Sequence, residues 1–274
     1  MNSILITGGT GTIGAALARD ALLRGYTRVC IFSRDEYKQA MLRQTMTDPR
    51  LRWFLGDVRD RDRLRRALEG VDCVIHAAAL KRVEAGEFNP GEFVKTNVLG
   101  TLNLIEAAHD AGVKRVVGLS TDKALNPQNA YGASKLLMEK LLLAANNARG
   151  EHGPMFAVTR FGNVAGSRGS VIDLWRNAAL PEITDAACTR YWMNERDALE
   201  IIWAALDLMP SEPLVPVLRA YCLGDLLEAM GFREFVATGL RPGESLHEAL
   251  REGESSETAP RMTVEELRAG LAAL

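Results

Sequence analysis

Short apolar runs alternate with amphipathic stretches through the first 160 or so residues of the chain. Each run is too short for a helix and rich in Val, Ile and Leu, which is the pattern of a strand buried on both faces of a parallel sheet. The pattern predicts strands at residues 3–7, 28–32, 51–55, 73–76, 115–119 and 156–159.

The stretches between these runs have helical periodicity. They predict helices from residue 15 to the stop at Gly25, after Arg34 to about residue 46, and at residues 60–68, 90–111 and 131–146, the fourth opened by Pro90. Strict alternation of strands and helices specifies a parallel, doubly wound sheet with right-handed crossovers. The predicted fold class is therefore α/β, Rossmann-like, with a small C-terminal substrate-binding lobe.

The pattern loosens after Phe161 into Gly-rich and Pro-containing loops with short elements. We expect a nucleotide-binding domain over residues 1–161 and a mostly substrate-binding lobe over 162–274, interleaved and without a clear linker. Residues 251–259 are acidic and Ser-rich and predict a mobile connection. Thr263 and Glu266 have the spacing of a capping box and predict a final short helix.

Composition narrows the function classes. Of 274 residues 47% are hydrophobic, which suffices for a large core, and the formal net charge of -2 gives no reason to expect a nucleic acid or an anionic membrane as partner. The four cysteines and four histidines are scattered, which predicts no metal site and places Cys30 and Cys73 in strands as buried free thiols. No signal peptide or membrane-spanning run is present, and a strand follows Met1 closely, so we expect a cytoplasmic protein.

A glycine-rich loop joins the first strand to the first helix. Such a loop turns tightly, approaches a pyrophosphate and leaves it on the helix N-terminus, so it predicts a dinucleotide site. The loop consists of Gly8, Gly9, Thr10, Gly11, Thr12, Ile13 and Gly14.

The end of the second strand indicates which dinucleotide binds. A carboxylate there suits the ribose of NAD, whereas a cation suits the 2′-phosphate of NADP. Ser33 and Arg34 occupy this position and Asp35 follows, so we expect NADP, with NAD less favoured. Asp57 and Val58 after the third strand contact the adenine edge in this reading; the alternative is that Asp57 only serves a turn.

Residues 120–135 carry the chemistry. They follow a predicted strand, and side chains beyond the carboxyl ends of parallel strands reach the ligand crevice. Tyr131 and Lys135 are four apart and share a helix face, which suits a tyrosine proton acceptor with an ammonium group that depresses its pKa. Asp122 and Lys123 are adjacent opposite charges, which taken alone more commonly form a loop ion pair; their place at the strand end, ahead of Tyr131 and Lys135, favours a catalytic acid and base.

Several stretches together carry a family resemblance: residues 8–14, 76–81, 96–97, 120–123, 131–135, 162–171 and 240–244. On these the chain resembles the extended short-chain dehydrogenase/reductases. Within them it is most similar to the 5-inverting UDP-N-acetylglucosamine 4,6-dehydratases of flagellin glycosylation and polysaccharide biosynthesis. A Thr-Asp-Lys sequence at 121–123, in place of Thr-Asp-Glu, separates this group from the retaining hexose dehydratases.

The resemblance implies that a nicotinamide is reduced and then reoxidised within one cycle. Tyr131 would take the proton of the sugar 4-hydroxyl, and Lys135 would hold the cofactor ribose. Lys123 would remove the C5 proton, Asp122 would protonate the departing 6-hydroxyl, and Thr121 would bond near O4. Hydride would return to C6, and protonation of the opposite face would invert C5.

The resemblance also assigns binding residues. Besides the loop residues and strand ends named above, it places Lys38, Ala77, Ala78, Asn97, Ser120, Tyr131, Lys135 and Val164 at the cofactor. It places Lys81, Asn163, Arg168, Gly169, Ser170, Val171, Ile172, Thr189, Arg241 and Glu244 at a UDP-sugar. Arginine suits the diphosphate because it binds phosphate in a bidentate manner. Glu244 either orients Arg241 or binds the uridine ribose. A homo-oligomer, dimeric or larger, is implied as well.

Departures from the family pattern lie on the substrate side. Ser245 stands where lysine is usual, Arg82 replaces histidine, and the segment between Ile172 and Thr189 is a few residues shorter than in the family. Two rival enzymes would share the site, a UDP-sugar 4-epimerase and a dehydratase that does not invert C5. An epimerase would leave Asp122 and Lys123 without a task. A rival from another class is a catalytically silent NADP-binding regulator, which typically lacks the Tyr131–Lys135 pair.

Overall fold

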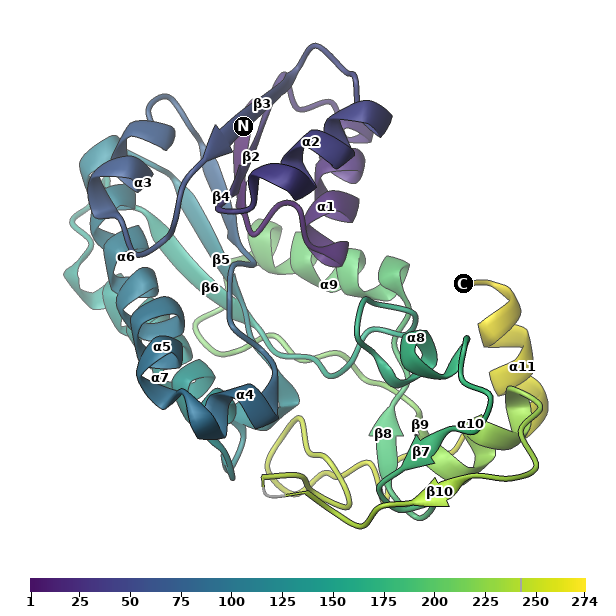
Figure 1. The fold of residues 1–274 in the computed structure, drawn as a ribbon. Coiled ribbons are helices and arrows are strands. Elements are labelled where there is room, and N and C mark those ends of the chain that lie inside the picture. Colours follow the sequence, from purple (N-terminus) through teal and green to yellow (C-terminus); the bar gives the residue numbers. More distant parts are fainter. Residues whose placement is uncertain (242) are drawn as a thin grey trace.

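The computed structural model describes residues 1–241 and 243–274. Its centre is a six-stranded parallel sheet in the order β3-β2-β1-β4-β5-β6 (Figure 1). The strands are β1 (Ser3–Thr7), β2 (Arg28–Ser33), β3 (Leu51–Leu55), β4 (Cys73–His76), β5 (Arg115–Leu119) and β6 (Met155–Thr159). This is the Rossmann-like doubly wound order, so the predicted fold class is confirmed.

Alternate residues of each strand enter different cores, because successive side chains of a strand point to opposite faces. Ile4 and Ile6 of β1 join a core with residues of α1 (Thr12–Leu23), whereas Leu5 joins a second core on the other face. That second core contains side chains from α3 (Arg61–Ala67), α6 (Gly100–Ala111) and α7 (Ala130–Ala148). All three β1 residues are fully buried. The apolar runs thus form the middle layer between two layers of helices.

The helices of the first half lie close to their predicted bounds. The helix α2 spans Glu36–Thr45, and Asp35 and Asp60 cap α2 and α3 by accepting from backbone amides. The predicted helix at 90–111 is continuous in direction but has three parts: α5 (Pro90–Phe93), a π-helical turn η1 (Val94–Leu99) and α6. A short helix α4 (Val83–Phe88), absent from the prediction, precedes them.

The second half forms a separate group of small elements below and to the right of the sheet in Figure 1. Its elements are α8 (Val171–Trp175), β7 (Glu182–Ile183), β8 (Thr189–Tyr191), β9 (Ala220–Cys222), α10 (Leu223–Ala229), β10 (Val236–Ala237) and α11 (Val264–Ala272). A third apolar core joins α8, α10 and α11. The capping box of Thr263 and Glu266 is present and opens α11 as predicted.

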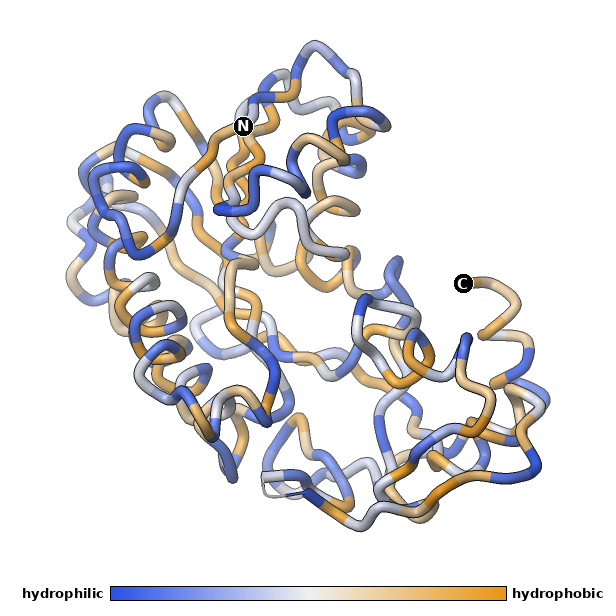
Figure 2. Tube along the Cα trace, viewed as in Figure 1, coloured by the Kyte–Doolittle hydropathy of each residue, from blue (hydrophilic) through white to orange (hydrophobic). Residues whose placement is uncertain are grey.

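One helix of the second half returns to the sheet. The helix α9 (Glu195–Leu208) packs on the same face as α1, and its Ala198 and Ile202 are fully buried in the core with Ile4. Figure 2 shows orange, hydrophobic chain along the strands and along the inner side of these helices. Residues after 162 therefore build part of one helix layer against the central sheet as well as the smaller lobe.

Two further findings bear on the composition. Cys30 and Cys73 are free and buried, as predicted. In the part of the chain that the structure describes, no helix is both long and apolar enough to cross a membrane.

Candidate active site

The catalytic stretch begins where β5 ends. Ser120 and Thr121 follow the strand, and a single 3-10 turn, η2 (Asp122–Ala124), carries the next three residues. The helix α7 then starts at Ala130, capped by the side chain of Asn129. Tyr131 and Lys135 lie on successive turns of α7, so the fold brings the predicted catalytic residues to the carboxyl end of the sheet.

Asp122 is almost fully buried, with 3% of its surface exposed. Its Oδ1 accepts from Thr121 Oγ1 at 2.7 Å and from the Lys123 amide at 2.9 Å. Its Oδ2 faces Gly162, where a Cβ would stand 3.2 Å away. The carboxylate is therefore fixed on one side, and glycine keeps space beside its other oxygen.

Lys123 lies between two carboxylates. Its Nζ is 3.3 Å from Asp122 Oδ1 and 3.1 Å from Glu248 Oε1. Burial by itself lowers a lysine pKa, but the attraction of Asp122 and Glu248 outweighs it and raises the pKa of Lys123 above its ordinary value. In the ligand-free protein, Lys123 is consequently an ammonium group.

Tyr131 has a raised pKa. Burial favours the neutral phenol, while a hydrogen bond with Thr121 and the charge of Lys123 oppose this effect only in part. The four-residue spacing of Tyr131 and Lys135 predicts that the ammonium group of Lys135 depresses this pKa. In the structure the cation that lowers the Tyr131 pKa is Lys123. Lys123 and Tyr131 therefore interact more closely than their separation in the sequence indicates.

Lys135 is 3% exposed and turns its ammonium group inward. Nζ donates to the carbonyl of Leu119, the last residue of β5, and lies 2.9 Å from Met138 Sδ. Burial lowers the pKa of Lys135 to about 7, although Glu139 opposes the shift. This lysine lacks the close carboxylate that Lys123 has.

The glycine-rich loop fits a dinucleotide. A Cβ on Gly8 would stand 2.8 Å from the Ala78 amide nitrogen, and one on Gly14 would stand 2.4 Å from the Gly8 carbonyl oxygen. No side chain caps α1, so amides of its first turn remain for an anion. At the other end of the site, the buried Ser120 hydroxyl lacks a partner among the described residues. The site could thus hold a pyrophosphate and a further polar group.

The adenosine end is rich in charge. The Arg34 guanidinium is half exposed and 3.9 Å from Asp57 Oδ2, whereas Arg59 binds the same carboxylate at 2.8 Å. Asp35 pairs with Lys38 at 2.7 Å and caps α2. The nearby carboxylates are thus engaged by cations, and Arg34 remains open to solvent.

A buried hydrogen-bond network supports the cofactor side. The Thr7 hydroxyl bonds His76 Nδ1 at 2.8 Å, and burial lowers the pKa of His76 to about 3, which keeps it neutral. Asn97, predicted to bind the cofactor, uses its side chain to hold Leu80 on both backbone groups and to bond Ser134 at 2.9 Å. Ala77 and Ala78 lie between these groups and the glycine loop. Asn97 therefore fastens the loop after β4 to α7.

The predicted substrate residues converge from the second half. The Arg168 amide donates to Thr12 Oγ1 of the glycine-rich loop at 3.3 Å, which brings the two loops together. Desolvation by the surrounding protein, together with the charges of Arg82 and Arg168, lowers the pKa of Lys81, although part of its side chain is exposed. Asn163, Arg168 and Gly169 are exposed.

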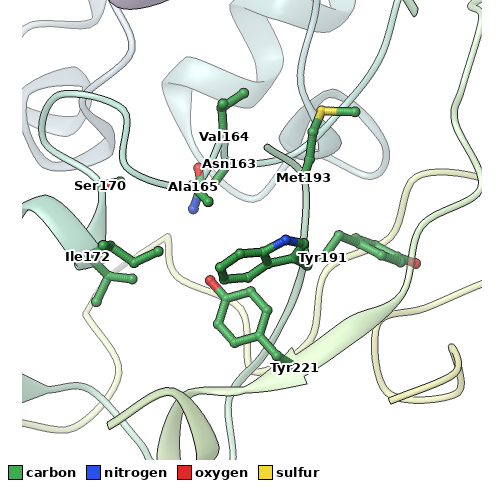
Figure 3. A pocket seen from close by; sticks show the side chains of 10 residues that line it. Asn163, Val164, Ala165, Ser170, Ile172, Tyr191, Met193 and Tyr221 are labelled. Carbon is green, nitrogen blue, oxygen red and sulfur yellow. The ribbon is translucent and has the colours of Figure 1, made fainter. Parts of the chain in front are cut away.

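A small pocket lies next to these residues, between the loop after Asn163 and the strands β8 and β9 (Figure 3). The ring of Tyr221 points from β9 into this pocket, and Ile172 lines another side. Val164, Ser170 and Val171 line it as well.

Thr189, Arg241 and Glu244 differ in accessibility. Thr189 is 1% exposed and its hydroxyl bonds His247 Nδ1 at 2.8 Å and Ser256 Oγ at 2.6 Å. Glu244 accepts from the Arg241 backbone amide at 3.1 Å. Glu244 therefore shapes the turn that presents Arg241, and contact of these residues with a substrate stays a prediction.

The remaining predicted residues lie as follows. Ser33 and Val58 are buried at strand ends, and Ser33 bonds the Gln39 side chain. Ser170 caps α8. Within residues 1–241 and 243–274, no three His, Cys, Asp or Glu side chains gather in a way that could hold a metal ion.

Sequence reasoning missed Glu248 and the buried pair of Glu139 with Arg160. Arg160 binds Glu139 in bidentate fashion at 3.0 and 2.6 Å. None of these residues belongs to a motif, and they come together only through the fold, so no local pattern could have indicated them.

Comparisons with known proteins agree with this geometry. The chain is 42% identical over 264 residues to UDP-N-acetylglucosamine 4,6-dehydratase (inverting) of Campylobacter jejuni, covering 93% of this chain and 78% of that protein. It is 38% identical over 264 residues to a UDP-glucose 4-epimerase of Rickettsia conorii, covering 90% and 77%.

Solved structures give the same picture. Pen from Bacillus thuringiensis superposes with a TM-score of 0.95 at 32% identity, covering 100% of this chain and 98% of that one. DesIV from Streptomyces venezuelae, a dTDP-glucose 4,6-dehydratase solved with NAD and TYD, has a TM-score of 0.81 at 25% identity, covering 98% and 96%. The family model for polysaccharide biosynthesis proteins matches residues 4–266, and the chain belongs to that family.

Proposed function

We propose that this protein is a nucleotide-sugar dehydratase that removes water across C5 and C6 of UDP-N-acetylglucosamine or a close UDP-hexose, with inversion at C5. The observation that carries the proposal is the pair of buried Asp122 and partly buried Lys123 beside Tyr131 at the end of β5. An oxidoreductase that only moved hydride would need no buried acid and base there. The similarity to the inverting dehydratase of Campylobacter jejuni supports this reading.

A bound nicotinamide would accept the C4 hydride and return it to C6. The chain would do the proton chemistry. Tyr131 receives the proton of the 4-hydroxyl, and the positive charge of Lys123 stabilises the phenolate. Lys135 lies one turn further along α7 and would hold the ribose once its ammonium group turns from the Leu119 carbonyl toward the crevice.

The elimination needs one proton on the pair of Asp122 and Lys123. In the ligand-free protein this proton is on Lys123. Its transfer from Nζ to Oδ1, across 3.3 Å, produces a neutral amine and a carboxylic acid. The amine then removes the C5 proton, and Asp122 gives its proton to the departing 6-hydroxyl, which leaves as water. A proton from solvent would then add to C5 from the opposite face as hydride returned to C6, which completes the inversion.

A specific observation favours a second candidate, a UDP-sugar 4-epimerase, because relatives at 38% identity carry that name. Incubation with UDP-N-acetylglucosamine in deuterated water separates the two. The dehydratase gives a product without the 6-hydroxyl and with deuterium at C5. Unlabelled UDP-N-acetylgalactosamine would establish the epimerase, and a protein that binds cofactor but changes no UDP-sugar would be a silent regulator.

Lys123→Ala sharpens this experiment. We expect loss of C5 exchange by about 10²-fold or more, because general-base catalysis contributes at least that factor. Cofactor binding should persist, since Lys123 is absent from the glycine-rich loop. Lys140→Ala, which removes an exposed lysine of α7, is the matched control and should exchange at the wild-type rate. Equal exchange in both variants would remove Lys123 from the mechanism.

For the cofactor we propose NADP. Arg34 is the cation at the tip of β2, and Asp35, which could otherwise bind a ribose, is held by Lys38. At 100 times its dissociation constant a ligand stabilises the native state by about 2.7 kcal/mol. We expect NADP to raise the melting temperature more than NAD at equal concentration, and Arg34→Ala to abolish the difference. A larger shift with NAD in the wild type would reverse the assignment.

A further inference from the structure

Glu248 lies far from the catalytic stretch in the sequence, but its side chain contacts Lys123 of that stretch. It belongs to the coil that precedes α11, and only 6% of its surface is exposed. Its Oε1 stands 3.1 Å from Lys123 Nζ, closer than the 3.3 Å that separates Nζ from Asp122 Oδ1. The smaller lobe thus supplies a carboxylate to the end of β5.

The backbone around Glu248 is held in place independently of Lys123. The Glu248 amide donates to Ser256 Oγ at 2.9 Å, and the Ser256 amide donates to the Glu248 carbonyl at 2.7 Å. The Arg190 guanidinium donates to the carbonyls of Leu246 and Ser245, both at 3.0 Å. The position of the carboxylate is therefore fixed before any substrate arrives.

The charges around Lys123 come from several elements. Asp122 is its sequence neighbour, Glu248 comes from the coil, and Arg190 of β8 lies 3.6 Å from Glu248. Tyr131 and Tyr221 also face the group, and burial raises the pKa of both phenols, which keeps them neutral. Burial and the charge of Asp122 raise the pKa of Glu248, while Lys123 and Arg190 oppose this shift. Glu248 is the carboxylate that contacts Lys123 without taking part in the proposed elimination.

We propose that Glu248 is a positioning residue for Lys123: its carboxylate holds Nζ against the end of β5 and stabilises the ammonium group that forms when Lys123 takes up the C5 proton. This inference rests on the proposed dehydratase function. In the step itself the C5–H bond breaks, its electron pair stays on the sugar as an enolate conjugated with the C4 ketone, and the proton joins the Nζ lone pair. Glu248 neither gains nor loses a proton.

Glu248→Gln tests the proposal because it keeps the shape of the side chain and removes its charge. The first readout needs no substrate: the Cε resonance of Lys123, identified by its loss in Lys123→Arg, is followed against pH in protein labelled with ¹³C-lysine. The wild-type lysine should titrate above its ordinary pKa of 10.5. The variant should titrate at least about one unit lower, since each tenfold change in charge stabilisation equals one unit.

The second readout is the rate of C5 deuterium exchange. Loss of the contact with Glu248 frees Nζ from its place at the end of β5, so we expect kcat of Glu248→Gln to fall about tenfold with KM unchanged, even though the lower Lys123 pKa by itself favours the neutral amine. Glu252→Gln removes an equal charge from an exposed position of the same coil and should leave titration and rate unchanged. Glu248→Asp keeps the charge at a longer distance, so its Lys123 pKa and its exchange rate should lie between those of wild type and Glu248→Gln. If Glu248→Gln does not fold, Glu248→Asp still tests the proposal.

Three outcomes are decisive. A Lys123 titration that coincides in wild type and Glu248→Gln overturns the proposal, as does an equal rate loss in Glu252→Gln. Absence of C5 exchange in the wild type contradicts the dehydratase function instead, and the substrate-free titration still reports on the contact between Glu248 and Lys123.

Discussion

Two buried lysines of this site have opposite pKa shifts, and the difference follows from a single kind of neighbour. Lys123 has two carboxylates within 3.3 Å, and its pKa is raised. Lys135 donates to a carbonyl and lies against a thioether sulfur, and its pKa falls to about 7. Desolvation acts on both, so the partners decide which lysine carries charge at neutral pH.

The depressed pKa of Lys135 predicts a pH dependence of stability. The unfolded lysine has its ordinary pKa of 10.5, so between about 7 and 10.5 the unfolded state binds more protons than the native state. The free energy of unfolding therefore rises with pH through this window, by at most about 1.4 kcal/mol per unit, and below pH 7 the penalty of charging the buried amine is constant.

Lys135→Met isolates this contribution. Urea unfolding of both proteins without cofactor, at pH 7, 8 and 9, should show the wild type gaining stability relative to the variant at each step. Lys140→Met changes an exposed lysine of the same helix and should show no such trend. A constant difference between wild type and Lys135→Met would mean that Lys135 keeps its ordinary pKa in the native state.

At the scale of residues, sequence reasoning works where partners are close in the chain. Asp122, Lys123, Tyr131 and Lys135 fall within fourteen positions, and a strand end followed by a helix start brings them together. Glu248 is 125 positions from Lys123, and its partner depends on how the smaller lobe meets the sheet. Such a contact is a property of the fold, which no local pattern encodes.

At the scale of elements, the start of α7 meets the catalytic turn with no space to spare. A Cβ at Gly132 would stand 2.1 Å from the Lys123 carbonyl oxygen, and backbone cannot yield as a flexible side chain does. Glycine at this position therefore sets the distance between the helix that carries Tyr131 and the turn that carries Lys123.

Gly132→Ala should consequently push α7 away from η2. We expect the free energy of unfolding to fall by about 1–3 kcal/mol, which is typical of overpacking. The rate of C5 exchange should fall by more than the decrease in the folded fraction accounts for. Gly91→Ala is the control, because a Cβ there meets nothing within 4 Å and alanine favours the helix α5. Denaturant unfolding and the deuterium assay measure the two effects, and wild-type exchange in Gly132→Ala would refute the tight approach.

The elements themselves were predictable to differing degrees. Strands buried on both faces are recognisable because every position is apolar, and all six of the central sheet were predicted. The π-helical turn η1 was not predicted, because its sequence has the pattern of an ordinary helix. Asn97 lies in this turn, and its side chain donates to the Leu80 carbonyl. The helix α9 lies in a region read as irregular, although its buried face joins the core under β1.

At the scale of the whole molecule, two arginines hold the coil of the smaller lobe: Arg190 from β8 within that lobe, and Arg160 from the end of β6 in the central sheet. Arg190 holds the backbone at residues 245 and 246, and Arg160 donates to the Leu250 carbonyl at 3.1 Å while binding Glu139 of α7. The coil that carries Glu248 is thus fastened on both sides. Because Glu139 follows Lys135 by one helical turn, this clamp also reaches the second catalytic lysine.

The pair of Glu139 and Arg160 predicts that removing one partner destabilises the protein more than removing both. The Glu139 side chain is 2% exposed and that of Arg160 is 12% exposed, so Arg160→Met leaves a buried carboxylate without its cation. Loss of one partner of such a pair costs about 3–5 kcal/mol, whereas replacing both by apolar groups is often nearly neutral. We therefore expect Arg160→Met to unfold at a much lower urea concentration than wild type and the double variant Glu139→Leu/Arg160→Met to recover most of the loss. If the double variant were as unstable as the sum of both single variants, the coil would depend on the bond from Arg160 to Leu250 and not on charge pairing.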